Sequence, residues 1–329
     1  MVLVAVDRAR ELARRLAPGL CAVALAACSS APKTEVDDKT EEKQLEDARQ
    51  YFAAGDLSKA EDATETLLET TRDPKRKQEA LFLAAEVHYA DQEYVKAFRH
   101  YQALVHDYPY SSFVPRCEDH IYAIGVEYLS RSRWFFFGDL FSGRERGAEV
   151  MREFAATFPS SSKADDALAA LAGYRYSRKE FDQAATFYAQ LARKYPDSEW
   201  ADLAAYRRAD CWRLHARGAG YDITPLLKAV VSYRRYLSER PNGEHRGEAQ
   251  EQAREVDEML ARSELLKAEL YVARENEPGA RIHYANVALA YPTTQAAEIA
   301  RRELAAKGQD LSQNSVGTLS LPPSTDLDE

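Results

Sequence analysis

The sequence has little glycine and proline, and fewer basic than acidic side chains. Only 14 glycines and 13 prolines occur among 329 residues, and because strand-and-turn architectures depend on such residues, their scarcity favours helices. Lys and Arg number 44 against 53 Asp and Glu, which gives a net charge of −9. Proteins bind nucleic acids with an excess of basic side chains that displace counterions from phosphate. We therefore expect no nucleic-acid partner.

Catalytic, cofactor-binding and metal-binding motifs are also absent from the sequence. It contains no H-E-x-x-H, no Cys/His spacing of a zinc site, no G-x-S-x-G, no P-loop and no G-x-G-x-x-G after a strand. Carboxylates are plentiful, but they are spread along predicted helix exteriors, whereas acid/base catalysis needs a pair in a water-poor pocket. We expect no enzyme, no cofactor and no small-molecule substrate. The alternative from another class, a hydrolase with appended repeats, would need a catalytic domain outside the repeats.

No apolar run is long enough to cross a bilayer, which takes about 20 residues. The apolar run at 16–27 follows several arginines and suits the central region of a signal peptide. It ends in Leu25-Ala26-Ala27-Cys28, which resembles a bacterial lipobox. In that family of signals the cysteine receives acyl chains such as palmitate and becomes the first mature residue. The sequence thus predicts a lipoprotein signal peptide over 1–27 and lipidation of Cys28; an ordinary cleavage site before a chance cysteine is the alternative.

The residues after Cys28 are polar and charged, and we predict a lipid-anchored flexible tether over 28–44. Ser29 resembles the second residue of lipoproteins that are sent to the outer membrane, so the expected location is the periplasmic face of that membrane. Two further cysteines, Cys117 and Cys211, lie on separate predicted helices. We interpret both as buried packing residues, with a free reactive thiol as the alternative.

An internal repeat fills most of the chain. Small, bulky and apolar residues stand twelve, eight and five residues before each of five prolines. The prolines are Pro109, Pro159, Pro196, Pro241 and Pro292; the small column is Ala97, Gly147, Ala184, Ala229 and Ala280; the bulky column is Tyr101, Met151, Tyr188, Tyr233 and Tyr284; the third column is Leu104, Phe154, Leu191, Tyr236 and Val287. A degenerate copy holds Ala60, Thr64 and Leu67. Such spacing puts the three columns on one helix face, and the proline ends the helix.

These columns predict an all-α solenoid of about six helix pairs over 45–307, closed by a C-terminal capping helix. The expected helices are 41–54, 57–71, 75–90, 94–107, 112–130, 144–157, 162–177, 181–194, 199–216, 224–239, 245–274, 279–290 and 294–306. Serines two residues after a proline, Ser111, Ser161 and Ser198, are expected to cap the helix that follows. Residues 308–329 contain no Lys or Arg and no apolar periodicity, which predicts a disordered acidic tail.

The columns look like the tetratricopeptide repeat, whose A-x3-F and terminal proline are represented by Ala97, Tyr101 and Pro109. Lipobox, charged tether and repeats together resemble the BamD-like family of outer-membrane assembly lipoproteins over about residues 25–307. Phe136-Phe137-Gly138-Asp139 looks like an insertion of that family.

The resemblance implies a lipid-anchored periplasmic scaffold that takes part in outer-membrane β-barrel protein assembly. Its implied partners are the barrel-forming core subunit of the assembly machine and the terminal segments of nascent outer-membrane proteins. The alternative is a tetratricopeptide lipoprotein that organises another cell-envelope system, of the peptidoglycan/Tol type or in secretion.

Two groups of side chains are candidate protein-binding residues. Trp134, Phe135, Phe136 and Phe137 form the most apolar stretch after the signal, as expected of an element that docks a partner. The alternative is a loop that folds back onto the repeats. Arg207 and Arg208, with Arg213 on the same predicted helix, could receive a carboxylate such as a peptide C-terminus. The alternative for them is a solvated helix face.

Overall fold

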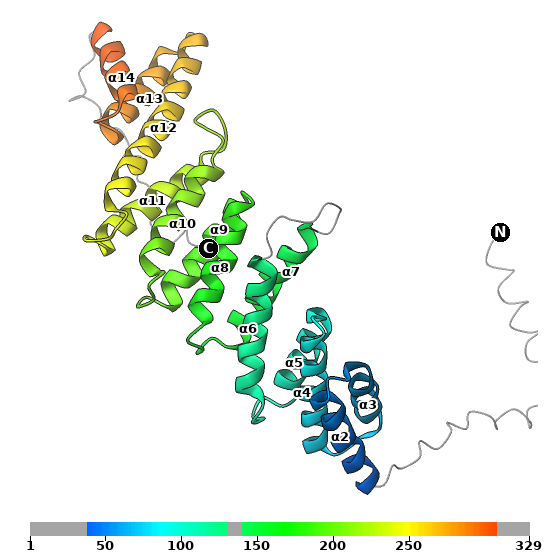
Figure 1. Ribbon diagram of the computed structural model, residues 1–329. Helices are drawn as coiled ribbons and strands as arrows, with labels where there is room; N and C mark the ends of the chain where they lie inside the picture. The colour runs from blue at the N-terminus through cyan, green and yellow to red at the C-terminus, as the bar shows by residue number, and fades with distance from the viewer. Residues whose placement is uncertain (1–37, 131–139, 308–329) are drawn as a thin grey trace, which may run out of the picture. The chain divides into compact units, whose positions relative to one another are not determined.

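A computed structural model describes residues 38–130 and 140–307, and within these ranges every regular element is an α-helix (Figure 1). The all-α prediction is confirmed for this part of the chain. The predicted signal peptide, Cys28, the aromatic residues 134–137 and the tail 308–329 lie outside the described residues.

The chain divides into two compact units, with the division between Phe113 and Val114. The first unit contains α2 (Asp38–Ala53), α3 (Leu57–Thr70), α4 (Pro74–Ala90) and α5 (Tyr94–Asp107). The second contains α6 (Val114–Ser130), α7 (Leu140–Thr157), α8 (Ala164–Ser177), α9 (Phe181–Lys194), α10 (Ala201–His215), α11 (Thr224–Glu239), α12 (Arg246–Ala273), α13 (Glu277–Ala290) and α14 (Gln295–Ala306).

Inside each unit, every helix packs against the next one along the chain. The described residues thus form six helix pairs, from α2/α3 to α12/α13, followed by the single helix α14. The predicted number of pairs and the capping helix are confirmed.

The three columns of the repeat are the contact faces of the second helix in each pair. Every residue of the three columns is buried, including those of the degenerate first copy. Burial of Tyr101, Tyr233 and Phe154 is complete, with no exposed surface on any of them. The prolines act as predicted, because each of the five stands two residues beyond the last helical residue, as Pro109 does after α5.

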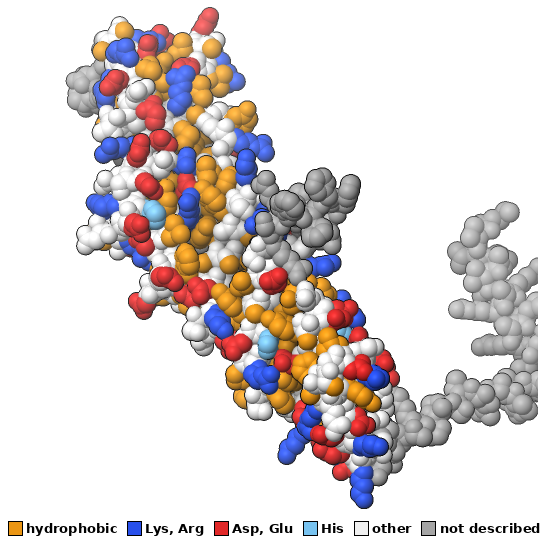
Figure 2. Space-filling model, viewed as in Figure 1, with side chains coloured by type: hydrophobic (Ala, Val, Ile, Leu, Met, Phe, Trp, Pro, Cys, Tyr) orange, Lys and Arg blue, Asp and Glu red, His pale blue; other side chains and the backbone are white. Residues whose placement is uncertain are grey.

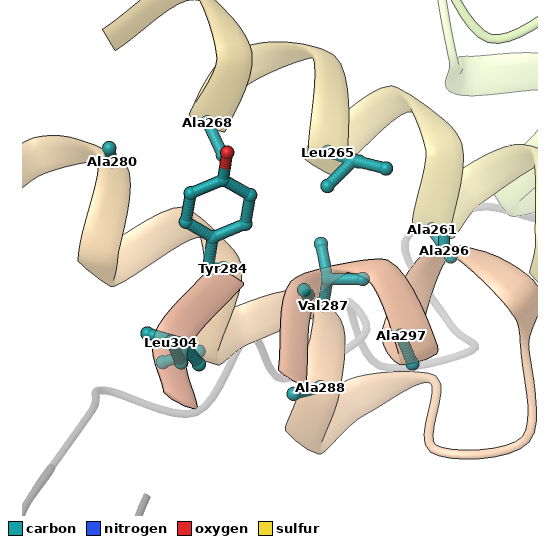
Figure 3. Packing of buried hydrophobic residues seen from close by; sticks show 12 residues of the cluster. Ala261, Leu265, Ala268, Ala280, Tyr284, Val287, Ala288, Ala296, Ala297 and Leu304 are labelled. Atoms are coloured by element: carbon teal, nitrogen blue, oxygen red, sulfur yellow. The ribbon is translucent and has the colours of Figure 1, made fainter. Parts of the chain in front are cut away.

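Helix α14 closes the second unit by covering the apolar face of α12 and α13 (Figure 3). Its Ala297 and Leu304 lie against Val287 and Tyr284 of α13, and α12 contributes Leu265 to the same cluster. All five side chains are at most 5 % exposed, so this end of the stack presents little of the face that another pair would otherwise cover.

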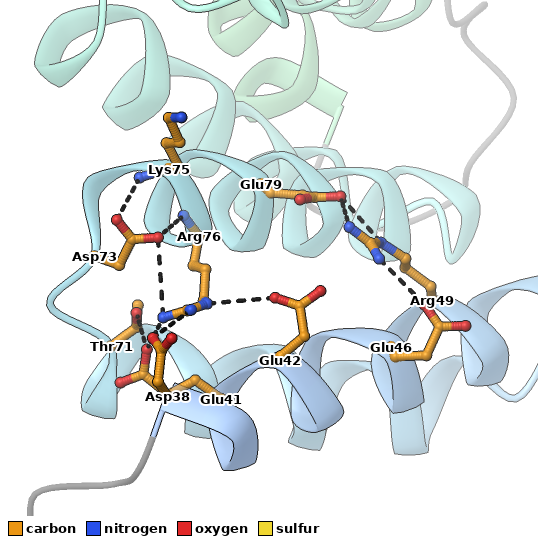
Figure 4. A network of polar contacts seen from close by, with 10 residues as sticks. All are labelled: Asp38, Glu41, Glu42, Glu46, Arg49, Thr71, Asp73, Lys75, Arg76 and Glu79. Carbon is orange, nitrogen blue, oxygen red and sulfur yellow. Dashed lines mark hydrogen bonds and ion pairs between the residues drawn. The ribbon is translucent and has the colours of Figure 1, made fainter.

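The start of the first unit differs from the predicted boundary. Helix α2 begins at Asp38, so the end of the segment 28–44 predicted as a tether is helical. Arg76 of α4 forms ion pairs with Asp38 and with the buried Glu41, whose Oε2 also accepts a hydrogen bond from the Thr71 hydroxyl at 2.9 Å (Figure 4). Thr71 and Arg76 lie 30 residues or more after Glu41 in the sequence. Local composition does not include such partners, and it therefore predicts a tether.

The serines after the prolines do not cap helices as predicted. Helices α8 and α10 have Lys163 and Trp200 at their N-cap positions, and neither side chain makes a cap hydrogen bond. Ser161 Oγ instead accepts from the Lys163 backbone N–H, and Ser198 Oγ from that of Trp200, both at 3.1 Å. The turn that follows each proline is longer than predicted, so the serine stabilises the turn and not the helix end.

Cys117 and Cys211 are both buried, as predicted for packing residues. Burial raises the pKa of the Cys211 thiol to about 12, which keeps that thiol protonated at neutral pH. None of the described helices combines the length and the apolar character needed to cross a membrane.

One small-column residue determines how closely α6 and α7 approach. A Cβ added to Gly147 would lie 2.9 Å from Tyr128 Cβ and 3.0 Å from the Leu129 backbone nitrogen, both on α6. Both distances are too short for a non-bonded contact of a methyl carbon. Gly173 on α8 is the opposite case, since a Cβ there meets no atom within 4 Å.

We predict that Gly147→Ala destabilises the second unit by about 1–3 kcal/mol because α6 and α7 must move apart. Gly173→Ala, the matched control, should be neutral or stabilise by about 0.5–1 kcal/mol through helix propensity. Urea unfolding of the full chain followed by circular dichroism measures both. Equal effects of the two variants would contradict the close contact at Gly147.

Candidate functional site

The first candidate surface is a groove of about 480 Å³ across α6, α8 and α10 of the second unit, here called the apolar groove. These are the first helices of three successive pairs. The residues that line it are mostly apolar: Tyr122, Asp166, Ala169, Ala170, Gly173, Tyr188, Leu191, Trp200, Leu203 and Ala204. On the face seen in Figure 2, hydrophobic side chains gather along the second unit with Lys and Arg side chains among them.

The apolar groove has small residues along α8 and large rings at its sides. Ala169, Ala170 and Gly173 leave space above α8, and Gly173 lacks any neighbour within 4 Å of its missing Cβ. The indole of Trp200 is held in place because its Nε1–H donates to Asp166 Oδ1 at 2.6 Å. A surface of this kind suits an extended apolar polypeptide, whose side chains would contact the rings.

The second candidate surface, here called the basic groove, is a hollow of about 490 Å³ between α9 and α11 above α10. Its charged lining consists of Arg193, Arg208, Lys228, Arg235 and one acid, Glu239. Alanines and Trp212 form its apolar part, and Lys228 Nζ lies 4.5 Å from the centre of the Trp212 ring. An excess of positive charge in a concave surface attracts anionic groups, carboxylates among them.

The structure separates the two arginines that were predicted to bind a partner. Arg208 lines the basic groove. Arg207 does not, and its Nη1 donates to the Tyr176 hydroxyl at 2.8 Å and to Asp210 Oδ2 at 3.1 Å. Asp210 is 3 % exposed and also accepts from Arg213 Nη2 at 2.7 Å. Arg207 and Arg213 thus neutralise a buried carboxylate of their own helix.

Sequence reasoning missed Arg193 and Lys228, which come from α9 and α11. Arg193 adjoins only Lys194 and Lys228 has no basic neighbour in sequence, so the packing of three helices brings both beside Arg208. Arg235 of α11 also lines the basic groove together with Arg208.

In the first unit, Glu61, His88 and Glu93 have donor atoms close enough together to hold a metal ion. His88 Nδ1 lies 2.9 Å from Glu93 Oε2 and 3.9 Å from Glu61 Oε1. The Lys96 ammonium already forms ion pairs with both carboxylates, at 3.1 Å to Glu61 and 2.9 Å to Glu93. A cation of this chain therefore occupies the position between the two acids.

The second unit contains the same arrangement with arginine in place of histidine. Arg175 of α8 donates to Glu180, five residues later, at 2.8 Å, and to Glu145 of α7 at 3.2 Å. The pair His88 and Glu93 has the same five-residue spacing and also contacts an acid on the preceding helix. We interpret both groups as ties between consecutive helix pairs, a role that needs no metal.

Two family models match the chain. Residues 79–111, which cover most of the α4/α5 pair, match a tetratricopeptide repeat model. Residues 144–316, more than half of the chain, match the family YfiO, described as outer membrane lipoprotein.

Solved structures of two repeat proteins are also similar. One is the C-terminal part of a TPR repeat-containing protein from Cytophaga hutchinsonii, with 14% identity, a TM-score of 0.30, and coverage of 79% of this chain and 87% of that one. The other is a tetratricopeptide repeat protein from Parabacteroides merdae, with 11% identity, a TM-score of 0.31, and coverage of 84% and 100%. No curated protein matches the chain.

The helix pairs and the first family match define a tetratricopeptide-repeat protein, a class that binds other proteins. The second match extends over α7 to α14 and includes every residue of the basic groove. The chain belongs to the YfiO family of outer membrane lipoproteins. Membership indicates a protein-interaction scaffold of the cell envelope.

A histidine beside the tie of the first unit, His100, predicts a dependence of stability on pH. His100 stacks on His88 with ring centres 5.3 Å apart, and burial, followed by the charge of His88, lowers the pKa of His100 to about 4 from its ordinary 6.5. Lys96 and Arg99 lower it further, whereas Glu61 opposes them. As the pH falls below 6.5, His100 takes up a proton in the unfolded chain but not in the folded one, so stability is lost toward pH 4.

We predict that the urea midpoint falls when the pH is lowered from 7 to 5, and that His100→Phe, which keeps a stacked ring, reduces this fall. Urea unfolding of the full chain and of the variant at several pH values, followed by circular dichroism, measures the difference. An unchanged pH profile in the variant would show that His100 does not carry the effect.

Proposed function

We propose that this protein is a lipid-anchored periplasmic scaffold of the outer-membrane β-barrel assembly machine. The observation that carries the proposal is the match of residues 144–316 to an outer membrane lipoprotein family. The helices that line both grooves lie within this range, except α6. The partners are the barrel-forming core subunit of the machine and nascent outer-membrane proteins, and the location is the periplasmic face of the outer membrane.

In this proposal the apolar groove binds the terminal segment of a nascent outer-membrane protein. Strands of membrane barrels alternate apolar and polar side chains, so an extended segment can place every second side chain on Ala169, Ala170 and Gly173. Trp200 and Tyr122 would contact its apolar side chains from both sides. No covalent chemistry is required. Binding energy comes from apolar contact, and the fixed indole of Trp200 limits the entropy that binding costs.

The other sequence candidates have separate roles in the proposal. Trp134, Phe135, Phe136 and Phe137 form a second docking element, which rests on their composition alone. Arg208 contributes to the basic groove, whereas Arg207 supports the fold through Asp210. Cys28 carries the acyl chains that hold the scaffold at the membrane, at about 0.8 kcal/mol for each buried CH₂ group.

A bulky side chain in the apolar groove should prevent binding without changing the fold. We predict that Gly173→Trp weakens binding of a peptide from the C-terminal strand of an outer-membrane barrel protein by about tenfold or more, because the indole fills the space above α8. Gly247→Trp is the matched control, since Gly247 is also helical with no atom within 4 Å of an added Cβ and lies outside the groove.

Fluorescence anisotropy of a labelled peptide measures both affinities, and a thermal melt checks that each variant is folded. Equal peptide affinities for the two variants would rule out the apolar groove as the site. Pull-down from detergent-solubilised outer membrane tests the wider proposal: recovery of the barrel-forming subunit supports it, and recovery of only peptidoglycan-associated or secretion components contradicts it.

We predict that Cys28→Ala releases the protein from the membrane without unfolding it, because the acyl chains and not the acidic body supply the attachment. Fractionation with a salt wash, followed by circular dichroism of the released protein, measures both properties. A variant that stays with the membrane fraction after the wash would contradict lipidation at Cys28.

A further inference from the structure

We propose that the acidic C-terminal segment 308–329 binds in the basic groove of its own chain. The segment follows α14 of the unit that contains the groove, and the two have opposite charge. The proposal is independent of the partner assigned above, because it depends only on residues of this chain.

The basic groove is an exception in an acidic protein. Four basic side chains and one acidic side chain line it, whereas the whole chain has a net charge of −9. The basic residues come from three helices and converge on one hollow, where the protein on three sides reduces screening by solvent. Trp212 and the alanines of α9 and α10 add an apolar floor, so the site suits a segment with both acidic and apolar side chains.

The segment 308–329 has this composition. It contains no Lys or Arg, and three of its acids, Asp326, Asp328 and Glu329, stand together with Leu327 among them. Pro322-Pro323 precedes this group, and two adjacent prolines favour an extended backbone. An extended segment can present carboxylates to the basic side chains while Leu327 contacts the apolar floor.

The segment is also long enough to reach. The segment follows α14, and α14 packs on α12. Helix α12 in turn packs on α11, which lines the basic groove. Helix α12 has 28 residues and therefore a length of about 42 Å. Residues 308–325 span up to about 60 Å when extended, at roughly 3.3 Å per residue, so the acidic group can reach the groove from the end of α14. Attachment to the same chain raises its effective concentration to the millimolar range.

Two consequences follow for the basic groove. The segment occupies it in the isolated protein, and an acidic partner must displace the segment before it binds there. Electrostatic attraction drives the contact, so high salt should release it.

Carbodiimide cross-linking of the full-length chain tests the proposal. The reagent joins a carboxylate to a lysine amine as an amide with loss of water, and Lys228 is the lysine that lines the groove. Mass spectrometry should find Lys228 joined to Asp326, Asp328 or Glu329. The yield should fall about fivefold or more when the salt is raised to about 1 M, where the screening length is about 3 Å.

Charge reversal supplies the matched comparison. Arg208→Glu with Arg235→Glu should lower the Lys228 cross-link about fivefold or more, since the groove loses its positive field. Two reversals outside the groove, Arg254→Glu on α12 with Arg302→Glu on α14, change the net charge equally and should leave the yield within about twofold. Melting curves show whether each variant is folded.

A mixture of isotopically light and heavy chains distinguishes the two possible sources of the carboxylate. Cross-links of uniform isotope content support binding within one chain. Mixed-isotope cross-links would assign the groove to the segment of a second copy and overturn the proposal. The absence of a Lys228 cross-link in the unmodified chain at low salt would also overturn the proposal. The same holds if neither high salt nor the charge reversals in the groove change the yield of that cross-link.

Discussion

The structure depends on one contact that recurs between consecutive helices: a small residue lets the neighbouring helix approach, and an aromatic or large apolar residue one turn later fills the space beside it. Ala97 with Tyr101, and Ala229 with Tyr233, are fully buried examples, one in each unit. Gly147 takes the small position where α6 and α7 come closest. A helix pair cannot bury both of its faces alone, so each pair requires the next, and α14 closes the series in the second unit.

This packing also explains why binding surfaces are available. The columns use one face of the second helix in each pair, and most residues that line the grooves lie outside the columns; Tyr188 and Leu191 in the apolar groove and Tyr236 in the basic groove are the exceptions. The groove across α6, α8 and α10 is lined mostly by small and aromatic residues, whereas α9, α10 and α11 contribute basic side chains to the other groove. Buried charges are neutralised within the fold, as Asp210 is by Arg207 and Arg213. The second unit therefore has two surfaces of different character.

The ties between helix pairs illustrate how far the repeats diverge. An arginine with two carboxylates joins α7, α8 and α9, and a histidine with a lysine does the same for α3, α4 and α5. The second version lies beside a stacked pair of imidazole rings, His88 and His100, which the arginine version does not include. Glu93 in one tie and Glu180 in the other each follow a residue with left-handed backbone, Gln92 and Lys179 respectively. This conformation turns the chain back toward the preceding helix.

Local spacing in the sequence is enough to predict the helices, their buried faces and the ends that precede a proline, because the columns recur at helical periods and the prolines interrupt backbone hydrogen bonding. Which charged side chains act together depends instead on the packing of the helices. Arg207 and Arg208 are adjacent in sequence but face a buried acid and an open groove respectively, and Arg193 and Lys228 join the latter from other helices. The start of α2 likewise depends on Arg76 of α4. Contacts between residues far apart in sequence follow from helix packing, which no local pattern encodes.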